Sequence, residues 1–189
     1  MNSHKQSLTT EYALLGFLYR QSMHGYELLQ RIQASHDDGL VWQVKQGMLY
    51  AVLTRLESEG LLESTLETQG ARPPRKRFRL TARGKTLFET WVQTPVRNGR
   101  DFRVEFLTKL YFAAQMGGAA ALTLIRRQIG LSQSQLHRLT FTDAGPIDPA
   151  SFAGLVSDFR VGQMEATLTW LHQCESFFAT VHAQEERTK

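Results

Sequence analysis

Residues 69–85 read QGARPPRKRFRLTARGK and hold seven basic residues within fourteen positions, with no acidic residue among them. Like charges repel one another, so such a run is normally either disordered or held against something negative. Apolar Phe78 and Leu80 alternate with arginines, which is the period of a half-buried strand. The run therefore predicts an ordered strand with one basic face; the alternative is a solvated ribbon that improves solubility. Its candidates for contact with DNA phosphates are Arg72, Arg75, Lys76 and Arg77.

The segments around this strand predict its setting. LESTLET (residues 62–68) is a second strand-like run, and a loop with two consecutive prolines separates the two. Apolar residues at helical spacing predict three helices upstream, the first running from Thr10 as N-cap to Tyr19 and the third ending at a glycine C-cap, Gly60. Thr81 can cap a fourth helix. The order helix, helix, helix, hairpin, helix is that of a winged helix-turn-helix, in which the hairpin forms the wing.

The third helix has an outward face suited to the major groove of DNA. Its apolar residues fall on one side of the helix and leave small and hydroxyl-bearing residues on the other. Bulky acidic side chains, which would repel phosphate, are absent from that face, whereas an ordinary solvated face would carry more Glu and Lys. Gln46, Tyr50 and Thr54 are candidates for hydrogen bonds to DNA, and Lys45 and Arg55 flank them. His24 is a secondary candidate for phosphate contact, the alternative being a residue that is solvated or part of a local turn.

Residues 96–189 are predicted to form a separate helical domain. Helical spacing indicates helices from about Phe102 to Ala114 and after Gly118. Asp148 as N-cap, with Pro149 behind it, begins a long last helix whose apolar series is interrupted at Gly162. The apolar series of that helix is too long to be buried on two short helices, so we expect a second chain to cover it. The predicted contact residues are Phe152, Leu155, Phe159, Trp170, Leu171 and Phe178.

The predicted fold class is therefore mostly α. A winged helix-turn-helix DNA-binding domain is expected over residues 1–95, and a helical dimerisation and effector domain over residues 96–189. Hydrophobic residues make up 42% of the chain and charged residues 21%, so a folded protein is expected. Residues 1–91 hold twelve Lys or Arg against nine Asp or Glu, which places +3 of the net +4 charge in the predicted DNA-binding half.

No catalytic or metal site is predicted. Cys174 falls on the apolar stripe of a helix, where a core residue is expected rather than a nucleophile. The six histidines show no ligand spacing, and no glycine-rich phosphate loop follows a strand. We therefore expect no enzyme activity, cofactor or metal. A single cysteine, no leader and no apolar stretch of membrane-spanning length predict a cytoplasmic protein without a membrane partner.

Four segments resemble, in order and spacing, the PadR family of bacterial transcriptional regulators: LLGFL (14–18), HGYELLQRI (24–32), GMLYAVLTRLESEGLL (47–62) and PRKRFRLTARGK (74–85). VRNGRDFRVEFLTKLYF (96–112) resembles the start of the longer C-terminal region in one branch of that family. The resemblance implies a homodimeric winged-helix regulator, usually a repressor, with C-terminal helices that dimerise and often an effector site near the junction of the halves. It would make DNA neighbours of His24, Tyr26, Gly47, Tyr50 and Arg75 to Arg77.

This sequence departs from the family pattern at Gln46, where a small hydroxyl cap is common, and in the two prolines of the wing. The predicted function is that of a sequence-specific DNA-binding repressor that binds an inverted repeat in double-stranded DNA and is released by a small aromatic effector. The alternatives are an effector-independent regulator, an activator, or a winged helix used for protein contact. Trp91, Trp170, Phe102 and Tyr111 can line a pocket for a flat ligand, although such a stripe is more often core.

Overall fold

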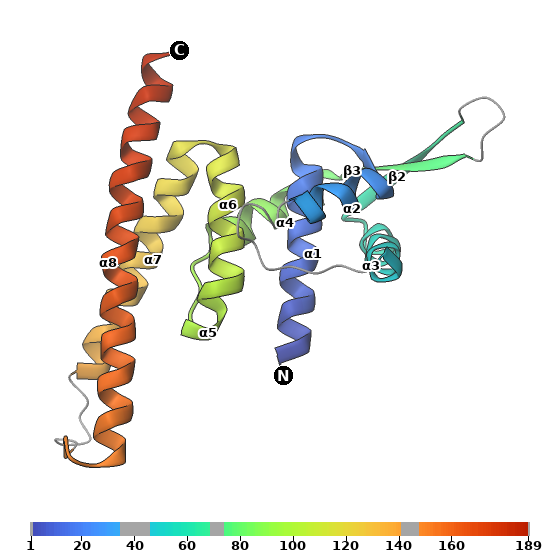
Figure 1. Ribbon diagram of the computed structural model, residues 1–189. Coiled ribbons are helices and arrows are strands. Elements are labelled where there is room, and N and C mark those ends of the chain that lie inside the picture. Colours follow the sequence, from blue (N-terminus) through green and yellow to red (C-terminus); the bar gives the residue numbers. More distant parts are fainter. Residues whose placement is uncertain (1, 35–45, 69–73, 141–147, 189) are drawn as a thin grey trace. The chain divides into compact units, whose positions relative to one another are not determined.

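The computed structural model describes residues 2–34, 46–68, 74–140 and 148–188, with side chains from residue 9 onward (Figure 1). The chain forms two compact units. The first comprises Met1–Val92 and Arg103–Lys109, and the second comprises Gln93–Phe102 and Leu110–Lys189. The two units are not separated by a single cut in the chain, because Arg103–Lys109 belongs to the first unit. The domain boundary at residue 95 stays a prediction.

The first unit is a winged helix-turn-helix, as the sequence predicts. Three helices, α1 (Asn2–Arg20), α2 (Gly25–Ala34) and α3 (Gln46–Ser58), precede the wing strands β2 (Leu62–Glu67) and β3 (Arg75–Leu80), and α4 (Ala82–Gln93) follows them. A short strand, β1 (Met23–His24), pairs with β3 and completes an antiparallel sheet in the order β1-β3-β2. The helices meet in a core of fully buried side chains that includes Leu14, Leu28, Leu53 and Phe88.

One local prediction for this unit is wrong, and one element was missed. α1 begins well before Thr10, which is buried inside the helix at 9% exposure and is therefore not its N-cap. β1 was not predicted, because a strand of two residues is too short to show alternation. Its Met23 pairs with Phe78 of β3, so the wing is anchored to the segment that enters α2.

The predicted helix ends on either side of the wing are confirmed. Gly60 has a φ of +70°, and the N–H groups of Gly60 and Leu61 donate to the carbonyls of Glu57 and Leu56 at 3.0 and 2.9 Å. This is the Schellman ending, which a glycine at positive φ permits. At the start of α4, Thr81 Oγ1 accepts a hydrogen bond from the Gly84 N–H at 3.0 Å. Both ends of the hairpin are thus fixed by helix caps.

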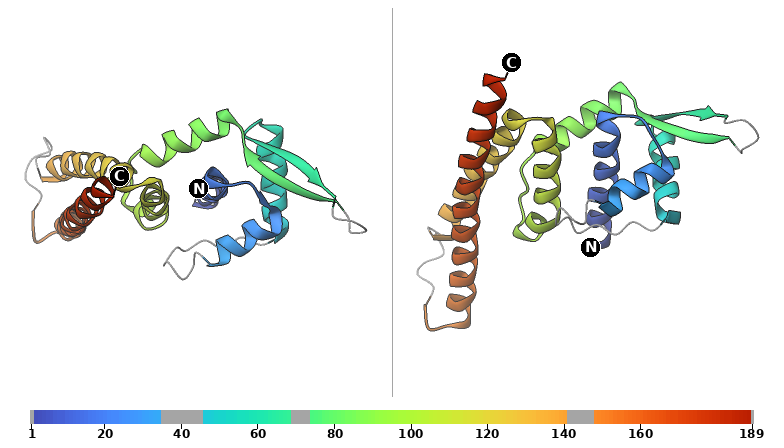
Figure 2. Two further views of the ribbon diagram at one scale, coloured as in Figure 1. Left: turned by 90° about the horizontal axis from the view of Figure 1, so that it is seen from above. Right: turned by 45° about the horizontal axis from the view of Figure 1, so that its top comes forward.

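The remaining elements are α5 (Gly99–Asp101), a π-helical segment η1 (Phe102–Phe106), α6 (Leu107–Met116), α7 (Gly118–Thr140) and α8 (Phe152–Arg187). α7 and α8 run side by side in both views of Figure 2. Their backbones come close at Gly118, where a Cβ would lie 2.9 Å from the Cα of His182. The Gly118 N–H donates to Glu185 Oε2 at 3.0 Å, so a side chain of α8 caps the start of α7.

The last helix differs from its prediction at both its start and its middle. The N-cap is Ser151, whose side chain accepts from the Gly154 N–H at 3.1 Å; Asp148 instead accepts from the Ala150 N–H at 2.9 Å, in the turn before the helix. Gly162 does not interrupt α8, which is continuous over 36 residues. Its neighbour α7 is not short either, with 23 residues, so much of α8 has a partner within the chain.

Within the described ranges, no helix is long and apolar enough to span a membrane. The same residues contain no group of three or more histidine, cysteine, aspartate or glutamate side chains that could hold a metal ion.

Candidate nucleic-acid interface

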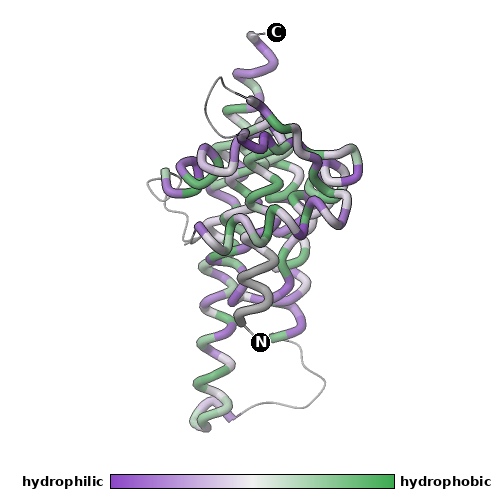
Figure 3. Tube along the Cα trace, turned by 90° about the vertical axis from the view of Figure 1, so that its right-hand side faces the viewer, coloured by the Kyte–Doolittle hydropathy of each residue, from purple (hydrophilic) through white to green (hydrophobic). Residues whose placement is uncertain are grey.

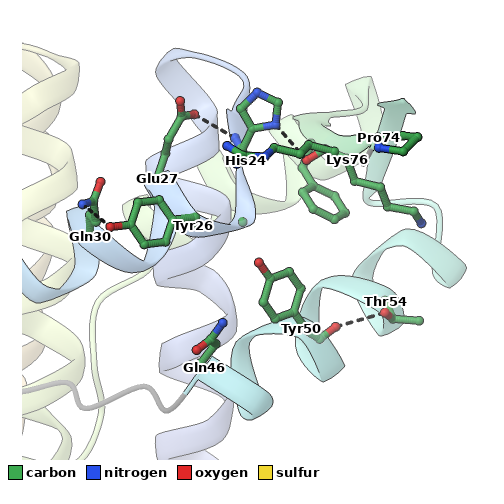
Figure 4. Close-up of a pocket in the computed structure, with 12 residues that line it drawn as sticks. His24, Tyr26, Glu27, Gln30, Gln46, Tyr50, Thr54, Pro74 and Lys76 are labelled. Carbon is green, nitrogen blue, oxygen red and sulfur yellow. Dashed lines mark hydrogen bonds between the residues drawn. The ribbon is translucent and has the colours of Figure 1, made fainter. Parts of the chain in front are cut away.

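A surface hollow of about 840 Å³ lies between α2, α3 and the wing (Figure 4). It brings together predicted DNA-binding residues from three separate segments: His24, Tyr26, Gln46, Tyr50, Thr54, Arg75 and Lys76. Gly47, Arg55 and Arg77 do not line it. Lys45 and Arg72 fall outside the described residues. Glu27 and Gln30 line the hollow and were not predicted.

α3 supplies the floor of this hollow. Its buried residues Leu49, Val52, Leu53 and Leu56 pack into the unit, which turns the opposite face outward. Figure 4 shows the Gln46 and Tyr50 side chains projecting from α3 into the hollow. Gly47 leaves open space, because nothing lies within 4 Å of the position that its Cβ would take. The predicted small, polar face therefore exists and is accessible.

Gly25, the first residue of α2, makes room for the Tyr50 ring. A Cβ on Gly25 would lie 2.7 Å from Tyr50 Cε1, which is closer than such atoms approach. The ring therefore lies directly against the backbone of α2, with 43% of Tyr50 exposed. Sequence reasoning named the neighbours of Gly25 but not Gly25 itself, since a glycine before a helix is explained as well by a turn.

Polar contacts order the start of α2. Glu27 Oε2 accepts a hydrogen bond from the His24 N–H at 2.8 Å, in the manner of a capping box. Tyr26 is 59% exposed, and its hydroxyl oxygen accepts from Gln30 Nε2 at 2.9 Å. Because Gln30 is the donor, the Tyr26 hydroxyl keeps its own hydrogen for an outside acceptor such as a phosphate oxygen.

The wing is not the unbalanced basic ribbon that the sequence predicts. In the antiparallel register, Glu63 of β2 faces Arg79 of β3, and Glu67 faces Arg75. The acidic residues precede the basic run in the sequence, so a count of charge within residues 72–85 misses them. Directly opposed strand positions bring side chains close enough to interact, and here they are of opposite charge.

Three of the four basic residues of β3 are paired. Nitrogen–oxygen distances are 3.0 Å for Arg79–Glu63, 2.7 Å for Arg77–Glu67, and 3.0 Å for Lys76 with Glu57 of α3. Hydrogen bonds from Ser64 and Lys76 lower the pKa of Glu57. Within the part of the chain that the structure describes, Arg75 forms no ion pair, and it lines the hollow. The cation most available to DNA is therefore Arg75.

His24 is held within the sheet. Its side chain is 13% exposed, and its Nδ1 lies 3.1 Å from the Lys76 carbonyl oxygen. Its Nε2 lies 3.2 Å from Glu67 Oε2 and 3.3 Å from Arg77 Nη2. The solvated alternative is therefore wrong, because the imidazole joins β1 to the base of the wing. Phosphate contact by His24 stays a prediction.

Arg55 is engaged within the protein. It forms a close ion pair with Glu11 of α1, and its Nε lies 3.9 Å from Glu59 Oε1. The hydrogen bond with Glu11 raises the pKa of Arg55. This pair ties α3 to α1, and contact of Arg55 with DNA stays a prediction.

The predicted dimer contact divides into two parts. Leu171 is fully buried within the chain, and the partly buried Trp170 packs edge-on to Phe102 with ring centroids 5.8 Å apart. Near the start of α8, large apolar side chains are exposed: Phe152 (81%), Leu155 (63%) and Phe159 (67%). Figure 3 shows hydrophobic segments at the lower end of this helix, near its start. Phe178 is half-buried, whereas its neighbour Phe177, which was not predicted, is 62% exposed.

The four aromatic residues considered for a ligand pocket are engaged in packing. In the first unit, Trp91 stacks on Tyr12 with centroids 4.6 Å apart, and Lys109 Nζ lies 5.0 Å from the Trp91 ring centroid. Lys109 is also 2.7 Å from Glu105, and burial raises the pKa of the Tyr12 hydroxyl. In the second unit, Phe102 packs on Trp170, and Tyr111 on Phe112. These contacts agree with the core interpretation.

A winged helix-turn-helix that presents an amide- and hydroxyl-bearing helix beside a basic wing defines a DNA-binding transcriptional regulator. Residues 14–90 match the model of the transcriptional regulator PadR-like family, and residues 102–178 match the model "Virulence activator alpha C-term". The chain therefore contains a PadR-like domain, which a C-terminal extension domain follows. Neither model is that of an enzyme.

The chain is similar to one curated relative and to several solved structures. The negative transcriptional regulator PadR of Bacillus subtilis strain 168 is 26% identical over 129 residues, which span 68% of this chain and 70% of that protein. The crystal structure of B. subtilis PadR with operator DNA is 22% identical, covers 88% of this chain and 97% of its own, and has a TM-score of 0.45. The structure of the same protein with p-coumaric acid is 21% identical, covers 92% and 97%, and has a TM-score of 0.40.

Proposed function

We propose that this protein is a transcriptional repressor that binds an inverted-repeat operator as a homodimer and leaves it when a small aromatic effector binds. The observation that carries the proposal is the hollow between α2, α3 and the wing, where hydroxyl and amide groups lie beside Arg75 and Lys76. Hydrogen-bonding groups with cations at their edge match base edges bordered by phosphates. Similarity to a negative transcriptional regulator supports repression rather than activation.

Dimerisation through the second unit is supported by the exposed apolar side chains of α8. Phe152, Leu155 and Phe159 are each more than half exposed, and burying such side chains is worth about 1.5–3 kcal/mol apiece. A second copy of α8 offers the same residues in an isologous contact. Two DNA-binding units held together require half-sites about one helical turn apart, on the order of 34 Å or a multiple.

An aromatic acid is the effector class that we include in the proposal. Its support is the relative B. subtilis PadR, whose structure has been solved with p-coumaric acid.

DNA footprinting with the full-length protein tests the proposal, together with sedimentation of the complex. We expect protection of two symmetric half-sites by two chains, and loss of protection when an aromatic carboxylate such as p-coumarate is added. A reporter placed behind the selected site should be silenced by the protein. Activation of the reporter, or insensitivity to every aromatic acid tried, would favour an activator or an effector-independent regulator. No binding to any duplex at low salt would favour a protein-contact module.

The dimer contact has its own test. Deleting α8 would also uncover the surface of α7 that buries Leu171, so point changes are cleaner than truncation. We expect Phe159→Glu to give a monomer with an unchanged circular dichroism spectrum and much weaker operator binding, because the two half-sites are no longer held together. Gln173→Glu, an exposed change on the same helix, is the control. A Phe159→Glu chain that remains dimeric would contradict this contact.

A further inference from the structure

Most of the outward side chains of α3 cannot donate a hydrogen bond to a base. Thr54 Oγ1 donates to the Tyr50 carbonyl at 3.0 Å, and Ser58 Oγ donates to the Arg55 carbonyl at 2.8 Å, so both hydroxyl hydrogens are used within the helix. A hydroxyl group has only one hydrogen to donate. Unless the internal bond breaks, these two hydroxyl groups can therefore only accept hydrogen bonds from DNA.

Two polar groups on this face keep their full capacity. The Gln46 amide and the Tyr50 hydroxyl form no hydrogen bond with any residue that the structure describes, and both line the hollow. Gly47 and Ala51, which share this face, have no polar side-chain atom. Of the two free groups, the glutamine amide combines a carbonyl acceptor and an N–H donor in one plane, whereas the tyrosine hydroxyl is a single point of contact.

We propose that Gln46 is the specificity-determining residue of α3 and reads one adenine in each half-site; this rests on the proposed binding of α3 in the major groove. Adenine presents N7 as an acceptor and its N6 amino group as a donor in that groove, and a glutamine amide matches both at once. Guanine and thymine offer only acceptors there, and cytosine only a donor, so no other base satisfies both ends of the amide.

The position of Gln46 suits this role. It is the first residue of α3, and the N-terminal residues of a recognition helix are those that contact base edges. It is exposed, and its amide has no hydrogen bond to a described residue that would have to break when it meets a base. Next to it, Gly47 has open space at its Cβ position, which lets the backbone approach the groove closely.

The test selects binding sites from a duplex library of random sequence with the full-length protein. The wild-type chain should enrich an inverted repeat with one invariant adenine in each half-site at the position facing α3. Gln46→Ala should enrich the same repeat without preference at that position, with a loss of roughly 5- to 150-fold for the adenine-containing site. Gln46→Glu should prefer cytosine there, because a carboxylate accepts from the cytosine amino group.

A modified base identifies the atoms. Replacing that adenine by 7-deazaadenine removes N7 and keeps base pairing, so wild-type affinity should fall while the affinity of Gln46→Ala should not change further. Gln133→Ala, an exposed glutamine of α7, is the matched control and should keep the wild-type preference. Thermal unfolding of all variants should coincide, because Gln46 makes no internal side-chain bond to a described residue.

Two outcomes would overturn the proposal. One is that Gln46→Ala and the wild-type chain select the same bases at every position. The other is that 7-deazaadenine weakens both proteins equally. A wild-type chain that enriches no sequence at all would refute the proposed DNA-binding function itself, which is a different result from normal binding with an unchanged base preference.

Discussion

α3 and the wing border the same hollow with opposite kinds of surface. The wing is rich in charge, yet three of the four cations on β3 are paired with glutamates of β2 and α3. The outward face of α3 has little charge, yet its Gln46 and Tyr50 side chains are exposed and form no hydrogen bond with a described residue. Capacity for contact with DNA depends on the groups that remain free after folding. It therefore differs from what residue counts along the chain indicate.

Among the changes that separate the role of α3 from that of the wing, Gly25→Ala should have the largest effect on operator affinity. It alters α3 by displacing the Tyr50 ring. The added Cβ would overlap the Tyr50 ring at 2.7 Å and push it out of the hollow. Operator affinity should fall about tenfold or more, the scale of one or two lost contacts. Unfolding free energy should change by no more than about 1 kcal/mol, because the partly exposed ring can swing into solvent. Fluorescence anisotropy with labelled operator and thermal unfolding measure the two quantities.

Gly130→Ala is the matched control for this change, since Gly130 is exposed on α7 and nothing lies within 4 Å of its Cβ position. It should leave operator affinity unchanged. Gly25→Ala combined with Tyr50→Ala removes the clash, and that double variant should bind no worse than Tyr50→Ala alone. If Gly25→Ala bound the operator as the wild-type chain does, the Tyr50 ring would have no part in recognition.

The sequence predicts the order of elements and the face of α3, because both follow from local rules. Helical spacing, the glycine at residue 60 and the cap at Thr81 are each readable within a few residues. What it could not predict depends on pairing between distant segments. The partners of Arg77 and Arg79 are fixed by strand register, and the room for Tyr50 is fixed by a glycine that lies 25 positions earlier.

In the second half of the chain, too, the sequence does not predict which distant segments pack together. Helical spacing predicts one apolar series on α8 and cannot tell which members of it α7 covers. The structure buries Leu171 and leaves Phe159 exposed, although both belong to the same predicted contact. The predicted N-cap at Asp148 is wrong because aspartate also stabilises tight turns, and Asp148 does so here. Ser151, three residues later, is the N-cap of the helix.

The next effect in size concerns the free and the paired cations of the wing. Arg75→Ala should weaken binding to operator and random DNA alike and reduce the slope of log affinity against log salt by about one. Arg79→Ala is the matched change on the same strand, but Arg79 is paired with Glu63 and does not line the hollow. We expect it to reduce the slope by much less. Equal reductions would mean that the internal ion pair does not limit contact with phosphate.

The smallest effect comes from freeing a paired cation. Glu57→Gln keeps an acceptor for Ser64 but removes the negative partner of Lys76, whose Nζ lies 3.0 Å from Glu57 Oε2. Lys76 lines the hollow, so we expect slightly tighter DNA binding and a steeper salt dependence. Stability should fall by about 1 kcal/mol or less, the usual worth of a partly exposed ion pair.

The ion pair between Glu57 and Lys76 can be checked by measuring how the effect of Glu57→Gln on stability depends on pH. Hydrogen bonds from Ser64 and Lys76 hold the pKa of Glu57 below its ordinary value of 4.5 in the folded protein. A carboxyl group with a depressed pKa adds stability above its unfolded pKa and loses that stability as the pH falls through its folded pKa. The wild-type chain should therefore be more stable than Glu57→Gln at neutral pH, and the difference should vanish below the folded pKa of Glu57. A difference in unfolding free energy that is constant from neutral pH into the acid range would assign it to packing, and Lys76 would then count among the free cations of the wing.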